Sequence, residues 1–213
     1  MERSALAVII PAFNEAASIA WVVTAVSAQG QAIVVDDRSR DQTADLAAAA
    51  GAIVVRHAEN RGYDGALNSG FAEAARRGFR YAITFDADGQ HDDALIGRFA
   101  RLLDEGNVLV AGVRPAPARL GEWIFAGYTR LRFGLRDPLC GMKGYDLALY
   151  REQGWFDSYR SIGTELALFA VKRRHRFAQV PVLIHPRHDS PRFGSLLRAN
   201  VRILRALACS LIR

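Results

Sequence analysis

Two carboxylates spaced two residues apart carry the clearest chemical signal in the sequence. Asp86 and Asp88 follow the apolar run 81–84, which has the composition of a buried strand. Strand side chains alternate between faces, so residues i and i+2 at a strand's end can point to one side. Because close like charges raise each other's pKa, an ionised pair favours a divalent cation, and carboxylate oxygens suit Mg²⁺ or Mn²⁺. The segment predicts a metal–diphosphate site, and Gln90 could also reach the metal.

The same segment also has a purely structural explanation. Asp86 and Asp88 could form a polar turn ahead of a helix that Asp92 and Asp93 cap. We favour the metal site for the first two residues, whereas Asp92 and Asp93 fit helix capping better than metal binding.

The elements that must position this pair alternate between strands and helices. The sequence predicts strands at 6–10, 32–35, 52–56, 81–85 and 108–111, and helices at 16–28, 41–50, 65–76 and 93–103. Continuous apolar strands separated by amphipathic helices indicate an α/β fold, with a mostly parallel sheet covered on both faces. Ligands of such sheets bind beyond the carboxyl ends of the strands. Asn14 and Glu15 follow one such end, and Asp36 and Asp37 follow another.

The second half of the chain is less regular, with several prolines after Gly112. We expect helices at 120–133 and 162–174, a strand at 177–184 that Pro181 interrupts, and a polar loop at 185–194. Ser195 is suited to cap a final helix. These boundaries predict one domain at 1–195, followed by a C-terminal helix at 196–213.

The composition indicates one cored domain in a reducing compartment. The chain has 213 residues, 50% of them hydrophobic, and its two cysteines, Cys140 and Cys209, lie far apart. We therefore expect neither a disulfide scaffold nor a zinc site. No apolar run reaches the roughly 18 residues of a membrane-spanning helix. The first residues do not resemble a signal peptide, so we expect a cytoplasmic protein.

Charge is distributed unevenly along the chain. Residues 1–109 carry a net charge of −5 and residues 110–213 a net charge of +11, which gives +6 overall. An acidic half that holds the carboxylate pair and a basic half fit a metal and an anionic partner. A general preference for arginine is the alternative, since Lys143 and Lys172 are the only lysines. Nucleic-acid binding is not expected, because the basic residues are not interleaved with aromatic ones.

Four segments, of which the last contains the carboxylate pair, follow one another in a specific order. They are residues 9–15 (IIPAFNE), 34–43 (VVDDRSRDQT), 60–70 (NRGYDGALNSG) and 86–88 (DAD). Together they resemble the family 2 glycosyltransferases, which have the GT-A fold, over about residues 5–195. The resemblance implies a metal-dependent enzyme that moves a sugar, with inversion, from a UDP- or GDP-sugar donor to an acceptor.

Other segments resemble the branch of that family that makes dolichol- or polyprenyl-phosphate sugars. They are residues 112–114, 137–143 and 187–195. The last segment departs from the branch's pattern, because no lysine follows residues 192–195. The branch implies a polyprenyl phosphate as acceptor and peripheral contact with the inner face of the cell membrane. A polymer product is not expected, because the Gln-x-x-Arg-Trp segment of processive synthases is absent.

The resemblance also implies a set of donor-binding residues. They are Pro11, Ala12, Asn14, Glu15, Asp36, Asp37, Gly65, Asp86 and Ala87. Asp36 would accept a hydrogen bond from an N–H group of a uracil or guanine ring. Local explanations stand beside these roles: Asn14 and Glu15 suit a helix start, Asp36 suits a turn, and Gly65 permits close helix packing.

The resemblance also gives Asp88 a catalytic role, as a ligand of the metal. It makes Glu165 a candidate general base, with Asp137 as its rival. An ionised lipid phosphate needs little help from a base, and Glu165 could instead complement a helix dipole. The basic positions suited to bidentate phosphate contacts are Arg114, Arg119, Arg187 and Arg192. Their alternative is an ordinary surface position.

The last predicted helix is basic and amphipathic. Arg198, Arg202 and Arg205 fall on one face at helical spacing, and Val201 and Leu204 face elsewhere. This pattern fits a helix lying on an anionic membrane. A helix docked on the core with a solvated arginine face fits equally well.

Two other functions remain as alternatives. A sugar-phosphate nucleotidyltransferase would need a glycine-rich loop after the first strand, where this chain has PAFNE at residues 11–15. A nucleotide-sugar-binding or inactive homologue that recruits partners to membranes would bind the donor without releasing nucleoside diphosphate.

Overall fold

A seven-stranded sheet lies at the centre of the computed structural model, which describes residues 5–88, 92–183 and 196–212. Its strands are β1 (Leu6–Ala12), β2 (Gln31–Asp36), β3 (Ile53–Arg56), β4 (Tyr81–Thr84), β5 (Leu109–Val113), β6 (Lys143–Asp146) and β7 (Phe177–Pro181). They follow the order β3-β2-β1-β4-β6-β5-β7. β6 runs antiparallel to β4 and β5, and the other neighbours are parallel. The predicted α/β class with a mostly parallel sheet is confirmed.

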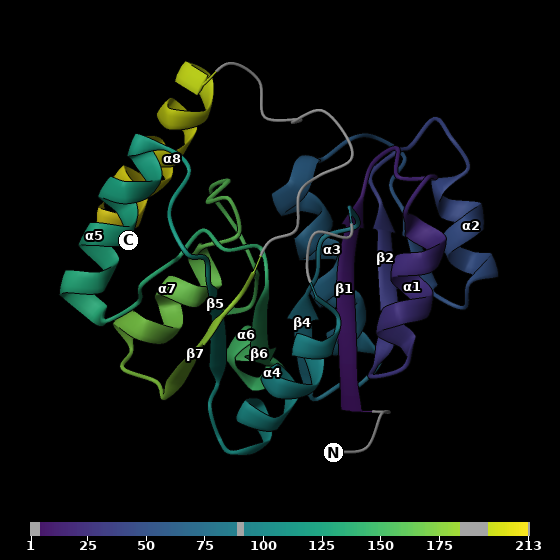
Figure 1. Ribbon diagram of the computed structural model, residues 1–213, viewed down its shortest axis with the longest axis horizontal. Helices are drawn as coiled ribbons and strands as arrows, with labels where there is room; N and C mark the ends of the chain where they lie inside the picture. Colours follow the sequence, from purple (N-terminus) through teal and green to yellow (C-terminus); the bar gives the residue numbers. More distant parts are fainter. Residues whose placement is uncertain (1–4, 89–91, 184–195, 213) are drawn as a thin grey trace.

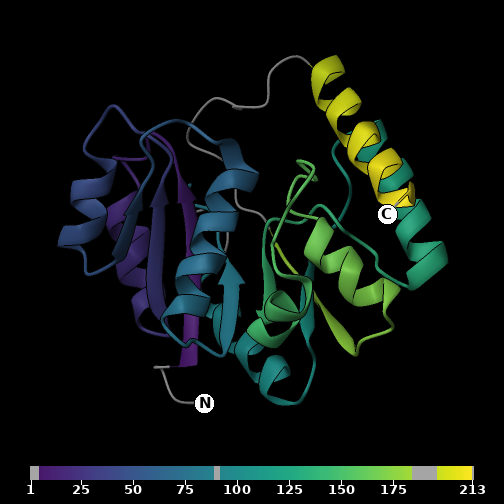
Figure 2. The same ribbon diagram turned by 180° about the vertical axis from the view of Figure 1, so that it is seen from behind.

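Helices cover both faces of this sheet (Figure 1, Figure 2). They are α1 (Ile19–Ser27), α2 (Thr43–Ala49), α3 (Gly62–Arg76), α4 (Ala94–Asp104), α5 (Leu120–Phe133), α6 (Leu147–Gln153), α7 (Glu165–Lys172) and α8 (Leu196–Ile212). α1, α2 and α4 contribute to one core cluster, and α3, α6 and α7 to the other. The alternation of strand side chains divides the core: Leu6, Val8 and Ile10 join the first cluster, and Ala7 and Ile9 the second.

The sequence did not predict β6 and α6. The residues of β6 read KGYD, which lacks the apolar run that marks the other strands. The pairing of β6 depends on distant residues, since Gly144 lies opposite both Ile83 of β4 and Val110 of β5. A segment without an apolar run therefore forms an internal strand of the sheet, between β4 and β5.

The other predicted elements are present with shifted ends. α7 begins at Glu165 rather than at 162, because Arg160, Ile162 and Gly163 have left-handed backbone angles (φ 58°, 60° and 67°) that a right-handed helix excludes. β7 ends at Pro181, and the Val182 N–H that follows still donates to the Val113 carbonyl of β5 at 2.9 Å.

The C-terminal helix α8 lies side by side with α5 at one edge of the molecule (Figure 1, Figure 2). The Gly121 N–H donates to Asn200 Oδ1 at 2.8 Å. A Cβ atom at position 121 would lie 3.3 Å from Ile203 Cγ2, so glycine permits this close approach. Within the described ranges, we find no helix with the length and apolar character needed to span a bilayer.

Candidate active site

A cavity of about 810 Å³ lies beyond the carboxyl ends of the strands. Residues that follow β1, β2, β4 and β5 contribute to its walls, which is the usual place for a ligand on a parallel sheet. The predicted residues that line it are Pro11, Ala12, Asn14, Glu15, Asp37, Asp86, Ala87, Asp88, Arg114 and Arg119. The sheet edge thus gathers acidic and basic side chains from both halves of the chain.

The turn after β1 is held by the loop after β2. The Asn14 N–H donates to Ser39 Oγ, and the Arg40 N–H donates to Asn14 Oδ1, both at 2.8 Å. The Glu15 N–H donates to Thr43 Oγ1 at 2.8 Å. Asn14 has a left-handed φ of 55°, which asparagine tolerates well. Because α1 begins only at Ile19, Asn14 shapes the cavity wall and does not cap the helix.

Asp37, rather than Asp36, borders the cavity. Its carboxylate accepts hydrogen bonds from the backbone N–H groups of Arg61 (2.7 Å) and Gly62 (2.8 Å), and it lies 2.7 Å from His57 Nδ1. Asp37 therefore fixes the start of α3, where a carboxylate complements the helix dipole. Asp36 is buried at the end of β2 and accepts from the Ser39 N–H at 3.2 Å.

Gly65 lies on α3 and does not line the cavity. A Cβ atom at this position would lie 2.5 Å from Arg61 Cβ. The glycine therefore serves the packing of the first turn of α3 against the segment that precedes it.

Asp86 and Asp88 lie on the same cavity wall, directly after β4. The turn before β6 packs against them, since a Cβ atom on Gly141 would lie 2.5 Å from Asp86 Oδ2. The Thr84 hydroxyl donates to the Gly141 carbonyl at 2.5 Å and fixes this turn to β4. Two carboxylates facing one cavity form the oxygen donor set that Mg²⁺ or Mn²⁺ prefers.

The protein alone supplies few ligands for such a cation. In the described ranges, no group of three or more His, Cys, Asp or Glu side chains is placed to hold a metal ion. Mg²⁺ commonly binds through one or two carboxylates together with water and substrate phosphates. The geometry therefore fits a cation that shares its ligands with a bound diphosphate.

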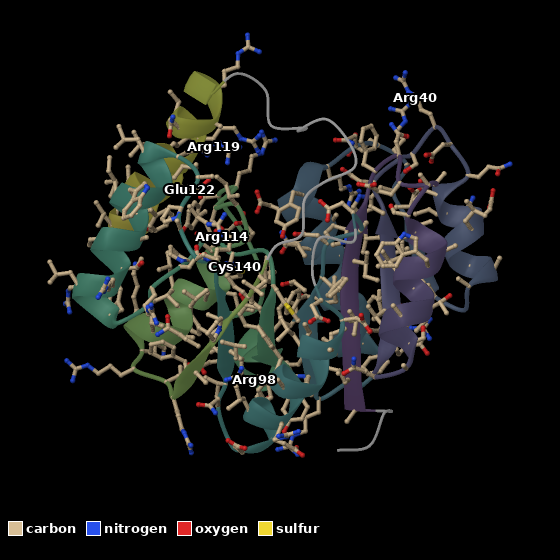
Figure 3. All side chains as sticks on the ribbon, in the orientation of Figure 1. Arg40, Arg98, Arg114, Arg119, Glu122 and Cys140 are labelled. Atoms are coloured by element: carbon tan, nitrogen blue, oxygen red, sulfur yellow. The ribbon has the colours of Figure 1, made fainter. Side chains whose placement is uncertain are left out.

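Arg114 and Arg119 line one wall of the cavity, here called the basic wall, and pair with two buried carboxylates, Glu122 and Asp137; Figure 3 labels Arg114, Arg119 and Glu122. Arg114 donates to Asp137 through Nε (2.7 Å) and Nη2 (2.9 Å), and its Nη2 lies 3.2 Å from Glu122 Oε2. Arg119 Nη1 donates to Glu122 Oε1 at 2.8 Å. Burial alone would lower the pKa of Arg114, but its hydrogen bonds with Asp137 and the charge of that carboxylate hold the pKa above its ordinary value.

Both candidate bases are engaged away from the cavity. Burial would raise the pKa of Asp137, but the hydrogen bonds and charge of Arg114 hold it below its ordinary value, and Asp137 does not line the cavity. The Glu165 carboxylate accepts hydrogen bonds from Trp155 Nε1 (2.8 Å) and from Ser158 Oγ (2.9 Å). Glu165 therefore braces the segment before α7.

Three predicted residues lie outside the described ranges: Gln90, Arg187 and Arg192.

The family model described as Glycosyl transferase family 2 matches residues 7–154, which is more than half of the chain. The chain belongs to the family 2 glycosyltransferases. This confirms the resemblance of the four ordered segments.

Several relatives are similar over most of their length. An uncharacterized glycosyltransferase of Mycobacterium tuberculosis is 35% identical over 216 residues, which cover 96% of this chain and 97% of the relative. A UDP-N-acetylglucosamine–dolichyl-phosphate N-acetylglucosaminyltransferase of Methanococcus voltae is 26% identical, with 82% of this chain and 83% of the relative covered. An undecaprenyl-phosphate mannosyltransferase of Micrococcus luteus is 26% identical, with 64% of each chain covered.

A solved structure has the same fold. Glucosyl-3-phosphoglycerate synthase from Mycobacterium tuberculosis, in complex with Mn²⁺, uridine diphosphate and phosphoglyceric acid, superposes with a TM-score of 0.75. It is 21% identical to this chain, and the alignment covers 98% of this chain and 78% of that one.

The cavity of this glycosyltransferase also includes residues that the sequence analysis did not single out individually as site residues. They are Phe13, Asn60, Gly62, Tyr63, Ala66, Leu139, Cys140, Gly141 and Ile162. Burial, followed by the charge of Asp86, raises the pKa of Tyr63 well above its ordinary value. The position of Tyr63 between two glycines of the segment 60–70 was a signal in the sequence. Its proximity to Asp86, however, results from the tertiary structure.

A buried lysine joins two walls of the cavity. Lys143 Nζ donates to the Cys140 carbonyl at 2.6 Å and to the Gly163 carbonyl at 3.2 Å. Burial lowers the pKa of Lys143, and the nearby Cys140 and Asp137 partly offset this effect. The lysine therefore links the turn beside Asp86 to the loop that carries Ile162.

Proposed function

We propose that this glycosyltransferase moves a sugar from a UDP- or GDP-sugar to a polyprenyl phosphate, with inversion at the anomeric carbon. The observation that carries the proposal is the lining of one cavity by Asp86 and Asp88 together with Arg114 and Arg119. The carboxylates suit a metal-bound diphosphate, and the arginines suit a second anionic group. The likeness to dolichyl- and undecaprenyl-phosphate glycosyltransferases supports this acceptor class.

Asp86 and Asp88 would hold a divalent cation, with Gln90 as a further proposed ligand. A bound Mg²⁺ or Mn²⁺ neutralises charge that develops on the leaving diphosphate. The solved glucosyl-3-phosphoglycerate synthase complexes with Mn²⁺ or Mg²⁺ and uridine diphosphate support this assignment.

The nucleoside would lie along the wall formed by Pro11, Ala12, Asn14 and Glu15. We propose that Asp37 borders the nucleotide from the start of α3, where its carboxylate is already fixed by two backbone N–H groups. Asp36 and Gly65 would contribute indirectly. Asp36 would shape the loop that holds Asn14, and Gly65 would permit the packing of the first turn of α3. Ala87 lies between the two metal-side carboxylates in sequence and is buried in the first core cluster, which would anchor this segment.

The acceptor phosphate would approach from the basic wall. Arg114 and Arg119 are held by Glu122 and Asp137, so the wall is preorganised. A phosphate oxygen attacks the anomeric carbon while the bond from that carbon to the diphosphate oxygen breaks on the opposite face. An ionised phosphate carries no proton that a base must remove, which agrees with the engagement of Asp137 and Glu165 elsewhere. We include Arg187 and Arg192 as proposed acceptor contacts.

Such an acceptor presents its phosphate at a membrane surface. The proposal therefore includes a cytoplasmic protein in peripheral contact with the inner face of the cell membrane.

The test is a transfer assay with Asp88→Asn and the matched control Asp92→Asn. Nucleoside diphosphate release is measured for UDP- and GDP-sugars, with Mg²⁺ or Mn²⁺ and polyprenyl phosphate in detergent. We expect Asp88→Asn to lose about 100-fold in turnover, because it removes stabilisation of the leaving group. The Asp92 carboxylate accepts from the Ala94 N–H at the start of α4 (2.9 Å) and does not line the cavity, so its variant should turn over like the native protein.

Two outcomes would contradict the proposal. Unchanged metal-dependent turnover in Asp88→Asn would remove Asp88 from the site. Donor binding without release of nucleoside diphosphate, for every donor and with polyprenyl phosphate present, would instead favour a nucleotide-sugar-binding protein.

A further inference from the structure

Large exposed apolar side chains gather on α5 and α8. On α5 they are Leu120 (71% exposed), Trp123 (59%), Ile124 (46%) and Leu131 (92%). On α8 they are Val201, Leu204, Leu211 and Ile212, between 40% and 88% exposed. Other exposed apolar side chains in the described ranges are scattered singly, as on most proteins. This concentration sets the two helices apart from the rest of the surface.

On α5 the apolar residues form one stripe. Leu120, Ile124, Gly127 and Leu131 recur at i, i+4, i+7 and i+11, so they share one side of the helix. The buried side of α5 includes Phe125, together with Glu122 and Thr129. A surface helix normally presents polar residues to water on the side opposite its buried stripe, and here that side is mainly apolar.

α8 has three sides rather than two. Ile203, Ala206 and Leu207 are buried in the core cluster that α5 shares. Arg198, Arg202 and Arg205 form a neighbouring basic side, and Arg205 Nη1 donates to the Tyr159 carbonyl at 3.1 Å. Val201, Leu204, Leu211 and Ile212 form the third, exposed apolar side. The helix is therefore docked on the core, as in the second alternative that the sequence offered. It still leaves an apolar side exposed.

The two apolar sides meet along the seam between the helices. Gly121 of α5 contacts Asn200 and Ile203 of α8. Leu120 and Ile124 are the helical neighbours of Gly121, and Leu204 is the helical neighbour of Asn200. We call this continuous surface the α5–α8 face, defined by Leu120, Trp123, Ile124, Leu131, Val201, Leu204, Leu211 and Ile212.

The charges beside the α5–α8 face decide which partner fits it. α5 and α8 carry a single carboxylate, Glu122, which is 4% exposed and paired with Arg114 and Arg119. Their exposed charges are all arginines: Arg130, Arg132, Arg198, Arg202 and Arg205. A second copy related by a two-fold axis would bring arginines against arginines without a carboxylate to pair them. Anionic lipid headgroups complement both the apolar face and its basic margin.

We propose that the α5–α8 face docks on the surface of a bilayer with anionic headgroups. This inference rests on the proposed function, because docking on a bilayer serves the enzyme only if the acceptor is a lipid phosphate. Arg119 lines the cavity and directly precedes Leu120, so docking brings the cavity's basic wall to the lipid surface. The apolar side inserts among the acyl chains, and the arginines contact the headgroups.

The natural tryptophans provide a direct test. The Trp21→Phe/Trp155→Phe variant keeps Trp123 on the α5–α8 face, and the Trp123→Phe/Trp155→Phe variant keeps Trp21 on α1, 52% exposed, as the matched control. Each is mixed with phosphatidylcholine–phosphatidylglycerol vesicles without donor or acceptor. We expect Trp123 emission to shift to the blue and to be quenched by brominated acyl chains. Trp21 emission should not change.

Vesicle sedimentation gives a second readout. The Leu120→Gln/Leu131→Gln variant should partition to the same vesicles at least about tenfold more weakly, because each change removes an apolar contact with the acyl chains. Trp21→Gln, an apolar-to-polar change on α1, should partition like the native protein. Because these substitutions lie outside the cavity, both variants should release nucleoside diphosphate in detergent at the native rate.

Four results would overturn the inference. They are no binding of the native protein to vesicles, an unresponsive Trp123, equal partitioning of the two variants, and a lipid-free dimer in sedimentation velocity that already shields Trp123. The last result would assign the face to a second copy. Native transfer in detergent with no vesicle binding would refute this inference alone, whereas vesicle binding with no transfer would refute the proposed function alone.

Discussion

At the scale of single residues, two buried carboxylates shape the loop that contributes Ile162 to the lining of the cavity. Asp157 accepts from the backbone N–H groups of Arg160 (2.6 Å) and Ser161 (2.7 Å). Asp64 of α3 accepts from the Gly163 N–H at 2.7 Å. These bonds hold a segment in which Arg160 and Ile162 adopt left-handed backbone angles, a costly conformation that the surrounding structure must impose.

Asp64 makes stability depend on pH. Burial, followed by the charge of Asp157, raises the pKa of Asp64 from 3.8 to about 6. The folded protein then binds a proton more tightly than the unfolded chain, so stability falls as pH rises between these two values. Asp64→Asn removes the ionisation and retains an oxygen acceptor for Gly163. We expect the variant's free energy of unfolding to exceed that of the native protein by about 1–3 kcal/mol above pH 7, and to approach it near pH 4.

Urea unfolding at the two pH values measures this effect. Asp45→Asn serves as the control, since Asp45 is an exposed carboxylate that pairs with Arg56. The same stability difference at both pH values would mean that Asp64 does not titrate in this window.

At the scale of elements, the position of α3 depends on one glycine. A Cβ atom on Gly70 would overlap Ile9 Cγ2 of β1 and would lie 3.3 Å from Val35 Cγ2 of β2. α3 also carries Tyr63 at the cavity and begins at the N–H groups that Asp37 holds. Close packing of α3 on the sheet therefore positions the residues that this helix contributes to the cavity.

We expect Gly70→Ala to lower the free energy of unfolding by about 1–3 kcal/mol, because the added methyl group overfills a packed interface. Gly127→Ala in α5 is the matched control, since no atom of another described element lies within 4 Å of its Cβ position. That variant should keep or raise stability by up to about 1 kcal/mol through helix propensity. Urea midpoints compare the two, and equal losses in both would refute a specific contact at Gly70.

At the scale of the whole molecule, the site lies where the two halves of the chain meet. The half with net charge −5 supplies Asp86 and Asp88, and the half with net charge +11 supplies Arg114 and Arg119. A ligand that contacts both halves should stabilise the molecule as a unit, because binding to the native state alone raises its apparent stability.

We therefore expect nucleoside diphosphate and Mn²⁺ together to raise the melting temperature by more than the sum of their separate effects. At about 100 times the dissociation constant the stabilisation amounts to about 2.7 kcal/mol. The matching nucleoside monophosphate, which lacks the second phosphate, is the control and should show little dependence on Mn²⁺. A shift for the diphosphate that is the same with and without metal would contradict a shared metal–diphosphate site.

The sequence alone determined the class of the fold and many of the residues that line the cavity. Strand and helix periodicity are local, so the alternation of elements in the first half and the helix at 120–133 follow from nearest neighbours in the chain. Parallel strands end at one edge, so Asn14, Glu15, Asp86 and Asp88 could be placed together before any contact was known.

The tertiary structure decided what depends on contacts between distant residues. It placed β6 in the sheet, gave Asp37 rather than Asp36 to the cavity, and paired Asp137 with Arg114. The tertiary structure also decided which side of α8 is exposed. Helical spacing separates the arginines of α8 from its apolar residues, but it does not determine which side packs on the core. Burial and pairing are properties of the packed molecule, and no segment of the chain contains them by itself.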